Sequence, residues 1–353
     1  MKNYGVHQFR HGKFGNYQLM RVFVTGHKGY IGPHVVELLK AAGHHVTGCD
    51  INLFQESQIA HVAVPDRDIE KDIRELELDD LRGYDCVMHL AAISNDPMGD
   101  INPDITYSIN LHGSIRLAQI SKEAGVTRFL FSSSCSIYGK GETNDLTESA
   151  SLNPLTAYAV SKIETEKALQ KMADESFCPV YLRNSTAYGF SPMFRIDLVV
   201  NNLLACALSK GDIQMKSDGE PWRPLIHCRD IAHAFVALLE APTSLIHNKA
   251  INIGSNDQNF QVKDVAAKVH DLVPSANIIF TGEVGADPRD YRVNFDLLTA
   301  ILPGFKFEYT LDTGMQHLLE VLRNMNFSAA DFDGERFVRL RLLKKNLALE
   351  PQL

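Results

Sequence analysis

Short, unbroken apolar runs recur along the first half of the chain and alternate with longer segments in which apolar residues return every three to four positions. Runs without polar alternation are typical of strands buried on both faces of a parallel sheet, and the longer period is typical of helices. The pattern therefore predicts an α/β fold with a doubly wound parallel sheet. The predicted strands are 22–24, 46–49, 86–92, 129–131 and 180–183, with a strand-like piece in 66–74, and the predicted helices include 104–124 and one from about Pro154.

The second half of the chain lacks this regular alternation. Beyond Gly189 the pattern predicts helices at 196–208, 229–240 and 262–272 and strands at 222–227 and 250–253. We expect residues 20–189 to form the domain with the wound sheet, and later strands to return to it from about 224–254. Residues 190–333 are expected to form a smaller C-terminal α/β region that binds substrate.

The two ends of the chain are expected to stand apart from these domains. Residues 1–19 lack the apolar core of a signal peptide, and we interpret them as a flexible extension with Met20 as a candidate original start. The tail 334–353 is basic with interspersed leucines, and a terminal packing helix or a frayed end is favoured over a membrane anchor. No apolar run approaches the roughly 18 residues that a membrane span needs.

Three glycines follow the first predicted strand at the spacing G-x-x-G-x-x-G. They are Gly26, Gly29 and Gly32, with Tyr30 and Ile31 between the last two. A dinucleotide diphosphate packs against backbone N–H groups at a helix N-terminus, where a Cβ would hold it away. A glycine turn without a ligand is the alternative, but strand, turn, helix and second strand are all in register here, which favours a Rossmann-type dinucleotide site.

Asp50 ends the second predicted strand, where a carboxylate can accept hydrogen bonds from both hydroxyls of the adenosine ribose. The same carboxylate would repel a 2′-phosphate. The sequence therefore predicts NAD rather than NADP as cofactor.

Composition narrows the remaining function classes. The chain has 353 residues, of which 45% are hydrophobic, and a formal charge of −8 with a pI near 6.0. This charge argues against a nucleic-acid partner, although a local basic pocket for phosphates remains open. The six cysteines form no C-x-x-C pair, so we expect reduced thiols in a cytoplasmic protein and no metal site.

Tyr158 and Lys162 lie four residues apart, on one face of a predicted helix. A tyrosine that takes a proton near neutral pH must lower its pKa from about 10 to about 7, which corresponds to roughly 4 kcal/mol. A nearby ammonium supplies part of that stabilisation. The pair alone is weak evidence, but it follows a strand that ends in Ser132, Ser133 and Ser134, whose hydroxyls can bind a substrate oxygen.

Taken in order, these motifs resemble those of the extended short-chain dehydrogenase/reductase family, in its nucleotide-sugar epimerase/dehydratase branch. The resemblance covers roughly residues 21–325. It rests on Gly26-x-x-Gly29-x-x-Gly32, Asp50, Asp72-Ile73, His89-Leu90-Ala91-Ala92, Asn110-x-x-Gly113, Ser132 to Gly139 and Tyr158-x-x-x-Lys162.

The resemblance implies a role for most of these residues. Tyr158 would be the catalytic acid and base, Lys162 would hold the nicotinamide ribose, and Ser134 would align the sugar hydroxyl. Cofactor contacts are further implied for Asp50 at the adenosine ribose, Asp72 and Ile73 beside the adenine, and Leu90, Ala91, Ala92 and Asn110 along the dinucleotide. The family also implies a homodimer that pairs the helices around 104–124 and 155–172.

A nucleoside diphosphate site is implied in the second half. The segments 218–227 and 287–292 resemble two family elements whose arginines, here Arg223 and Arg292, meet the diphosphate beside Asp290. Thr186 stands where the family usually has an asparagine that contacts the diphosphate, and Asn184 is shifted by two positions. The grip on the phosphates is therefore expected to differ from that of relatives.

Departures from the family pattern bear on the reaction. Dehydratases and decarboxylases carry an acidic residue where this chain has Ser136, and Cys135 is one position away from the cysteine of epimerase-reductases. We therefore expect an NAD-dependent epimerase of a nucleotide-diphosphate sugar, acting at C4, the commonest centre in the family. The alternatives are a 4-keto-sugar reductase that uses NAD(P)H, another nucleotide-sugar oxidoreductase, or a non-catalytic nucleotide-binding scaffold, although a scaffold need not keep Tyr158 and Lys162.

Overall fold

A computed structural model describes residues 18–94, 102–141, 145–282 and 289–349. The predicted extension 1–19 therefore lies almost wholly outside the described residues. Within them, no helix has the length and apolar character needed to cross a membrane.

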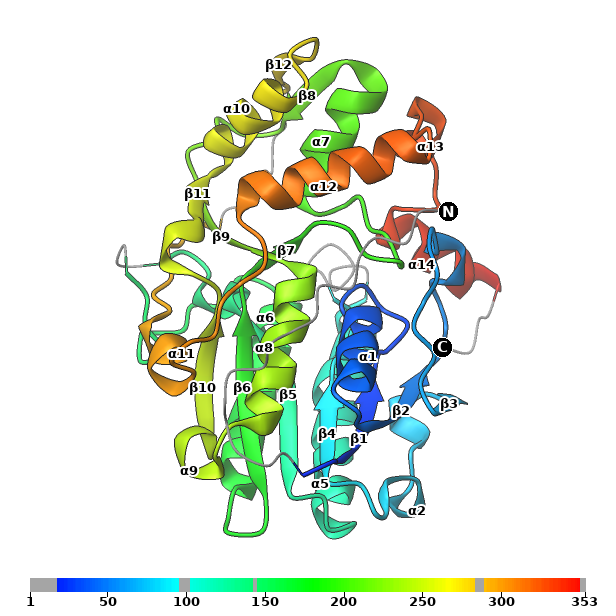
Figure 1. Ribbon diagram of the computed structural model, residues 1–353, viewed down its shortest axis with the longest axis vertical. Coiled ribbons are helices and arrows are strands. Elements are labelled where there is room, and N and C mark those ends of the chain that lie inside the picture. The colour runs from blue at the N-terminus through cyan, green and yellow to red at the C-terminus, as the bar shows by residue number, and fades with distance from the viewer. Residues whose placement is uncertain (1–17, 95–101, 142–144, 283–288, 350–353) are drawn as a thin grey trace.

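Seven parallel strands form the main sheet, in the order β10-β6-β5-β4-β1-β2-β3 (Figure 1). They are β1 (Arg21–Thr25), β2 (His45–Asp50), β3 (Arg67–Glu70), β4 (Cys86–His89), β5 (Arg128–Ser134), β6 (Cys178–Asn184) and β10 (Lys249–Ile253). The chain runs outward from β1 in both directions, so the carboxyl ends of β1 and β4 diverge at a switch point where doubly wound sheets bind ligands. The predicted doubly wound parallel sheet is confirmed.

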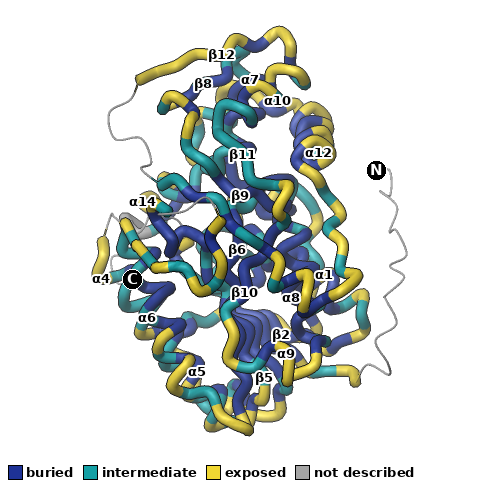
Figure 2. The backbone as a smooth tube through the Cα atoms, turned by 90° about the vertical axis from the view of Figure 1, so that its left-hand side faces the viewer, coloured by how far each residue is buried: buried dark blue, intermediate teal, exposed yellow. Residues whose placement is uncertain are grey.

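Helices cover both faces of this sheet. Side chains alternate across the strands, so Val22 and Val24 pack in the cluster of α1 (Gly32–Ala41) and α8 (Cys228–Glu240), whereas Phe23 packs in that of α5 (Ser114–Glu123) and α6 (Ala157–Met172). Figure 2 shows the strands as a buried centre within more exposed helices. The two buried faces account for the unbroken apolar runs in the sequence.

The predicted helix 104–124 is divided in the structure. Asn102 caps the short α4 (Pro103–Thr106), a π-helical stretch η3 (Tyr107–Gly113) follows, and α5 completes the segment. The π-helical stretch contains Asn110, whose side chain is directed to the backbone of Ile93 rather than to solvent. Such π-bulges are frequent at functional sites.

The second half builds a separate layer above the carboxyl ends of the main strands (Figure 1). It has a three-stranded sheet, β11-β9-β7, and a two-stranded sheet, β12-β8, packed by three helices around an apolar cluster of their own. These elements are β7 (Thr186–Tyr188), α7 (Val199–Lys210), β8 (Asp212–Met215), β9 (Trp222–His227), β11 (Asn259–Gln261), α10 (Val262–Leu272), β12 (Asn277–Phe280) and α12 (Leu311–Asn324).

Only part of the segment 224–254 returns to the main sheet. β10 pairs with β6, whereas β9 pairs with β7 and β11 in the upper layer. The expectation that the strands of 224–254 return to the main sheet was therefore wrong for β9. The chain returns to the main sheet only after β9, through the helix α8, which packs on that sheet. Short helices complete this half: α9 (Thr243–Ile246) and α11 (Asp296–Ile301).

The C-terminal tail folds back over the molecule. After α13 (Ala329–Asp333), the helix α14 (Arg339–Leu349) packs on the loop that follows β2 (Figure 1). Phe337, just before this helix, and Leu342 and Leu343 within it are buried. The tail is thus a packed helix, which was one of the two structures expected for it.

Candidate active site

A large cleft of about 1170 Å³ lies between the carboxyl ends of the main strands and the upper layer. Pockets for one small molecule are usually about 300–1,000 Å³. The larger volume therefore suits two ligands, and the residues of the two halves show which ligand each end would take.

The glycine turn forms one end of the cleft. Gly26 has φ of +74°, and a Cβ added there would lie 2.6 Å from the backbone nitrogen of Ala91. A Cβ on Gly32 would lie 2.3 Å from the carbonyl oxygen of Gly26. Gly29, Tyr30 and Ile31 complete the turn and line the cleft. The turn thus needs glycine for its own close packing, and it leads directly into α1.

The N-terminus of α1 is suited to an anion. Ile31 occupies the N-cap position, Pro33 follows in the first turn, and no side chain among the described residues caps this end. Backbone N–H groups at a helix start carry partial positive charge and bind phosphate readily.

Asp50 lies at the end of β2 and lines the same part of the cleft. Its carboxylate accepts hydrogen bonds from the backbone N–H groups of Lys28, at 3.0 Å, and Asn52, at 2.8 Å. These bonds fix the carboxylate next to the glycine turn. A ribose hydroxyl pair can use its remaining lone pairs, so glycine turn, helix start and Asp50 together fit NAD.

The wall beyond Asp50 contains Asp72 and Ile73, and Leu90, Ala91 and Ala92 form the floor. Asp72 does not end a strand, because β3 stops at Glu70. It caps the short helix η2 (Ile73–Glu75), and its carboxylate pairs with Arg74 at 2.7 Å. The Asp72 carboxylate therefore shapes the loop, while Ile73 offers an apolar surface.

Asn110 is not among the described residues that line the cleft. Its side-chain amide instead binds the backbone N–H and C=O of Ile93, at 2.8 and 3.0 Å. The backbone carbonyl oxygen of Asn110 accepts a hydrogen bond from the Ser114 hydroxyl. The buried His89 ring is hydrogen-bonded to that hydroxyl on one side and to the Thr25 hydroxyl, at the end of β1, on the other. Burial and the charge of Lys162 lower the pKa of His89 to about 3, so its imidazole is neutral at neutral pH. Asn110 thus positions the cleft floor.

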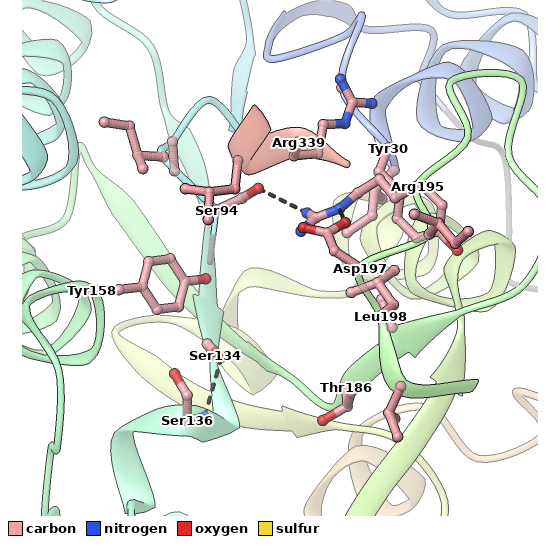
Figure 3. Close-up of a pocket in the computed structure, with 18 of the residues that line it drawn as sticks. Tyr30, Ser94, Ser134, Ser136, Tyr158, Thr186, Arg195, Asp197, Leu198 and Arg339 are labelled. Atoms are coloured by element: carbon pink, nitrogen blue, oxygen red, sulfur yellow. Dashed lines mark hydrogen bonds and ion pairs between the residues drawn. The ribbon is translucent and has the colours of Figure 1, made fainter. Parts of the chain in front are cut away.

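Ser134, Tyr158 and Lys162 meet at the carboxyl end of β5, as the sequence predicts for neighbouring elements. Ser134 ends the strand, and the other two residues come from the first turns of α6. All three line the cleft, and Figure 3 shows the Tyr158 hydroxyl pointing into it near Ser134 and Ser136. The Ser134 hydroxyl accepts a hydrogen bond from the Ser136 N–H at 3.1 Å.

Lys162 is almost fully buried, with 3% of its surface exposed. Its Nζ donates to the carbonyl oxygen of Ser132 at 2.7 Å and lies 5.5 Å from the centre of the Tyr158 ring. Burial lowers the pKa of Lys162 to about 7, and Glu166 opposes part of that shift. The ammonium is therefore desolvated and stays beside the phenol ring.

The other end of the cleft is basic. Thr186, Arg223 and Arg289 line it. Asp290 and Arg292 are not among the described lining residues. Asp290 accepts a hydrogen bond from the Trp222 N–H at 2.8 Å, and the Arg292 guanidinium stacks 4.5 Å from the Trp222 ring.

Further lining residues include Ser136 and Asn184, which the sequence marks as departures from the family pattern, and Arg195 and Asp197, which it does not single out. Ser136 has a buried hydroxyl with no partner among the described residues. Asn184 lines the cleft and donates to the Ser132 hydroxyl at 3.0 Å. Arg195 pairs with Asp197 at 3.0 Å and donates to Ser94 (Figure 3). For Arg195 and Asp197, the only hint in the sequence was that they form a charged pair inside the apolar run Met193 to Val200.

Outside the cleft, Asp230, His233 and Glu308 place one possible ligand atom each within 4.8 Å of one another. Both oxygens of Asp230 already accept hydrogen bonds from the backbone of Glu308 and Tyr309, and Arg229 pairs with Glu308 at 3.1 Å. The group fastens the loop before α12 to α8, and we assign no metal to it.

Comparison with known proteins adds to this geometry. Residues 22–254 match the model of the NAD dependent epimerase/dehydratase family. An uncharacterized UDP-glucose epimerase of Bacillus subtilis is 27% identical over 290 residues, covering 77% of this chain and 88% of the relative. The UDP-glucuronic acid decarboxylase 2 of Arabidopsis thaliana is also 27% identical, with 87% of this chain and 69% of the relative covered.

Solved structures give the same picture. The NAD-dependent NDP-hexosamine 5,6-dehydratase TunA, involved in tunicamycin biosynthesis, superposes with a TM-score of 0.78 at 26% identity, covering 86% of this chain and 97% of TunA. MoeE5, solved with UDP-glucuronic acid and NAD, superposes with a TM-score of 0.74 at 25% identity, covering 86% of this chain and 99% of MoeE5. With its glycine turn, its Asp50 and these matches, the chain belongs to the NAD-dependent epimerase/dehydratase family of extended short-chain dehydrogenases/reductases, and its cofactor is NAD.

Proposed function

We propose that the protein is an epimerase of a nucleotide-diphosphate sugar that acts at C4 through a transient keto-sugar. The observation that carries this proposal is the position of Lys162 and Tyr158 beside Ser134 in the same cleft as the glycine turn. When bound, NAD supplies a hydride acceptor that later returns the hydride. The protein's own residues handle the proton and hold the sugar.

Tyr158 takes the proton of the sugar hydroxyl as the carbonyl forms. Lowering its pKa from about 10 towards 7 requires roughly 4 kcal/mol of preferential phenolate stabilisation. The desolvated ammonium of Lys162, held by the Ser132 carbonyl, supplies part of it. Ser134 accepts from the Ser136 N–H, so its own hydroxyl hydrogen is left to bind the sugar oxygen.

The nucleotide must stay bound while the keto-sugar turns over to present its opposite face. Arg223 and Arg289 lie at the end of the cleft away from the glycine turn, where guanidinium groups can bind the diphosphate. Thr186 offers a hydroxyl on the adjacent β7. Because the similar proteins include UDP-glucose epimerases, a UDP-sugar is the first substrate to test.

The polar groups of the cleft favour epimerisation over elimination or decarboxylation. Ser136 lies where a dehydratase needs a carboxylic acid, and a hydroxyl is a poor proton donor to a leaving group. The carboxylate of Asp197, which also lines the cleft, is held by the Arg195 guanidinium at 3.0 Å through both of its oxygens.

We also propose a homodimer, as expected from the family. The outer faces of α5 and α6 would pair across a two-fold axis, next to the 43% exposed Leu155. Sedimentation that shows only monomer at micromolar concentration would refute this.

The test is turnover of a panel of UDP-, dTDP-, GDP- and CDP-sugars by purified protein with catalytic amounts of NAD, followed by proton NMR. The expected result is a C4 epimer with no net change in NADH absorbance. Turnover that instead consumes NADH or NADPH in stoichiometric amounts would show that the protein is a 4-keto-sugar reductase and not an epimerase. Nucleotide binding with no turnover of any sugar would support a scaffold.

A further inference from the structure

The C-terminal helix α14 is fastened across the cofactor end of the cleft. Leu340 and Leu343 pack with Ile93, Leu53 and Phe54 in a small apolar cluster. The Asn346 side chain donates to the carbonyl oxygen of Leu53 at 2.6 Å. The loop that this helix covers is the one that follows Asp50, so α14 closes the site next to the glycine turn.

Arg339, the first residue of α14, is directed into this corner. It is 2% exposed and lines the cleft together with Tyr30 and Asp50. Its guanidinium lies 4.1 Å from the centre of the Phe54 ring, and Nη2 donates to the carbonyl oxygen of Met193 at 3.1 Å. Nη1 is buried and has no hydrogen-bond partner among the described residues. Figure 3 shows Arg339 beside Tyr30 and Arg195.

The two buried arginines of this corner differ in their direct partners. Arg195 is also buried, and Asp197 neutralises it at 3.0 Å. Arg339 forms no ion pair with any residue in the described part of the chain. Burial and the charge of Arg195 lower the pKa of Arg339 to about 9, and the carboxylates of Asp197 and Asp50 oppose part of that shift, so Arg339 remains a cation at neutral pH. A buried guanidinium whose Nη1 has no acceptor among the described residues is costly unless a ligand supplies one.

We propose that Arg339 binds a phosphate oxygen of the NAD diphosphate, and that α14 is a wall of the cofactor site. The cleft would receive two diphosphates, one from NAD and one from the sugar nucleotide. Arg339 lines it beside the glycine turn and Asp50, whereas Arg223 and Arg289 come from the upper layer. A guanidinium fork with one free N–H edge suits a phosphate oxygen. The proposal holds whichever sugar reaction the enzyme performs.

The direct test measures binding of NAD, adenosine and UDP by calorimetry to the wild-type protein and to Arg339→Gln. Loss of one charge-assisted hydrogen bond predicts NAD affinity at least about tenfold weaker, with adenosine and UDP within about twofold of wild type. Lys345→Gln is the matched control, because it removes an exposed cation of the same helix that pairs with Glu56 at 3.1 Å. This control is expected to bind NAD as the wild type does.

A second measurement needs no variant. Hydrogen exchange of the wild-type chain is followed at residues 336–346 with NAD, ADP, adenosine or UDP. NAD and ADP should slow exchange there, and adenosine and UDP should not. An unchanged NAD affinity in folded Arg339→Gln would overturn the proposal. Slowed exchange with UDP and not with ADP would also overturn it, by assigning Arg339 to the sugar-nucleotide diphosphate.

Discussion

The Lys162 ammonium donates a 2.7 Å hydrogen bond to the Ser132 carbonyl oxygen. This bond joins the first turns of α6 to the carboxyl end of β5, and it holds the positive charge 5.5 Å from the centre of the Tyr158 ring. The proposed catalytic pair, Tyr158 and Lys162, is therefore placed by the strand as well as by the helix. The first two predictions follow from this arrangement.

Burial of Lys162 predicts a stability that depends on pH. The folded pKa is about 7, below the ordinary 10.5, so the unfolded chain binds the proton more tightly. Between these values the unfolding free energy should rise with pH relative to Lys162→Met, by at most about 1.4 kcal/mol per pH unit. Urea unfolding of both cofactor-free proteins at pH 6 to 9 measures this. Parallel pH profiles would contradict it.

Tyr158→Phe removes the proton acceptor and keeps the ring against which Lys162 lies. Turnover should fall about 10²–10⁴-fold, as for loss of a general base, while NAD affinity stays within about twofold. Steady-state kinetics on the best sugar nucleotide and NAD titration check the two parts. A variant that retains full turnover would remove Tyr158 from the mechanism.

Gly26→Ala should weaken NAD binding, whereas an alanine at another glycine of positive φ should not. The added Cβ would lie 2.6 Å from the Ala91 nitrogen on the cleft floor. Gly83 is the matched control, because its φ is +76° and no atom lies within 4 Å of an added Cβ. Each alanine should cost about 1–3 kcal/mol of stability through positive φ, but only Gly26→Ala should lose NAD affinity. Equal NAD affinities of Gly26→Ala and Gly83→Ala would contradict the conclusion that the cofactor site needs glycine at position 26.

Arg223 and Arg292 should differ although the sequence assigns both to the diphosphate. Arg223 lines the cleft, whereas Arg292 stacks on Trp222. Loss of a charge-assisted bond in Arg223→Ala should weaken UDP binding about tenfold or more. Arg292→Ala should change UDP binding less and lower the melting temperature. The opposite order of UDP affinities would restore the original assignment of Arg292.

Local sequence patterns predicted which residues of the glycine turn lie in one cleft with Asp50. Unbroken apolar runs identify buried parallel strands, and the glycine turn and Asp50 follow two of them directly, so chain order alone brings these residues together. The spacing of Tyr158 and Lys162 likewise needs only one helix.

Long-range packing explains what the sequence left out. Arg339 reaches the cleft because leucines of α14 pack on Phe54 and Ile93, far away in the chain. Asn110 supports the floor only because a π-helical stretch turns it towards Ile93. Arg289 rather than Arg292 lines the cleft because Trp222 holds the latter. No local pattern predicts such contacts.

In the proposed epimerisation, a hydride leaves C4 of the sugar and returns to the same carbon. The most direct test uses a UDP-hexose deuterated at C4, incubated in ordinary water with the enzyme and NAD, with the epimer examined by NMR and mass spectrometry. Hydride return at C4 predicts an epimer that keeps its deuterium at C4 and gains no solvent hydrogen elsewhere. Loss of that deuterium to water, or exchange at C3 or C5, would contradict it.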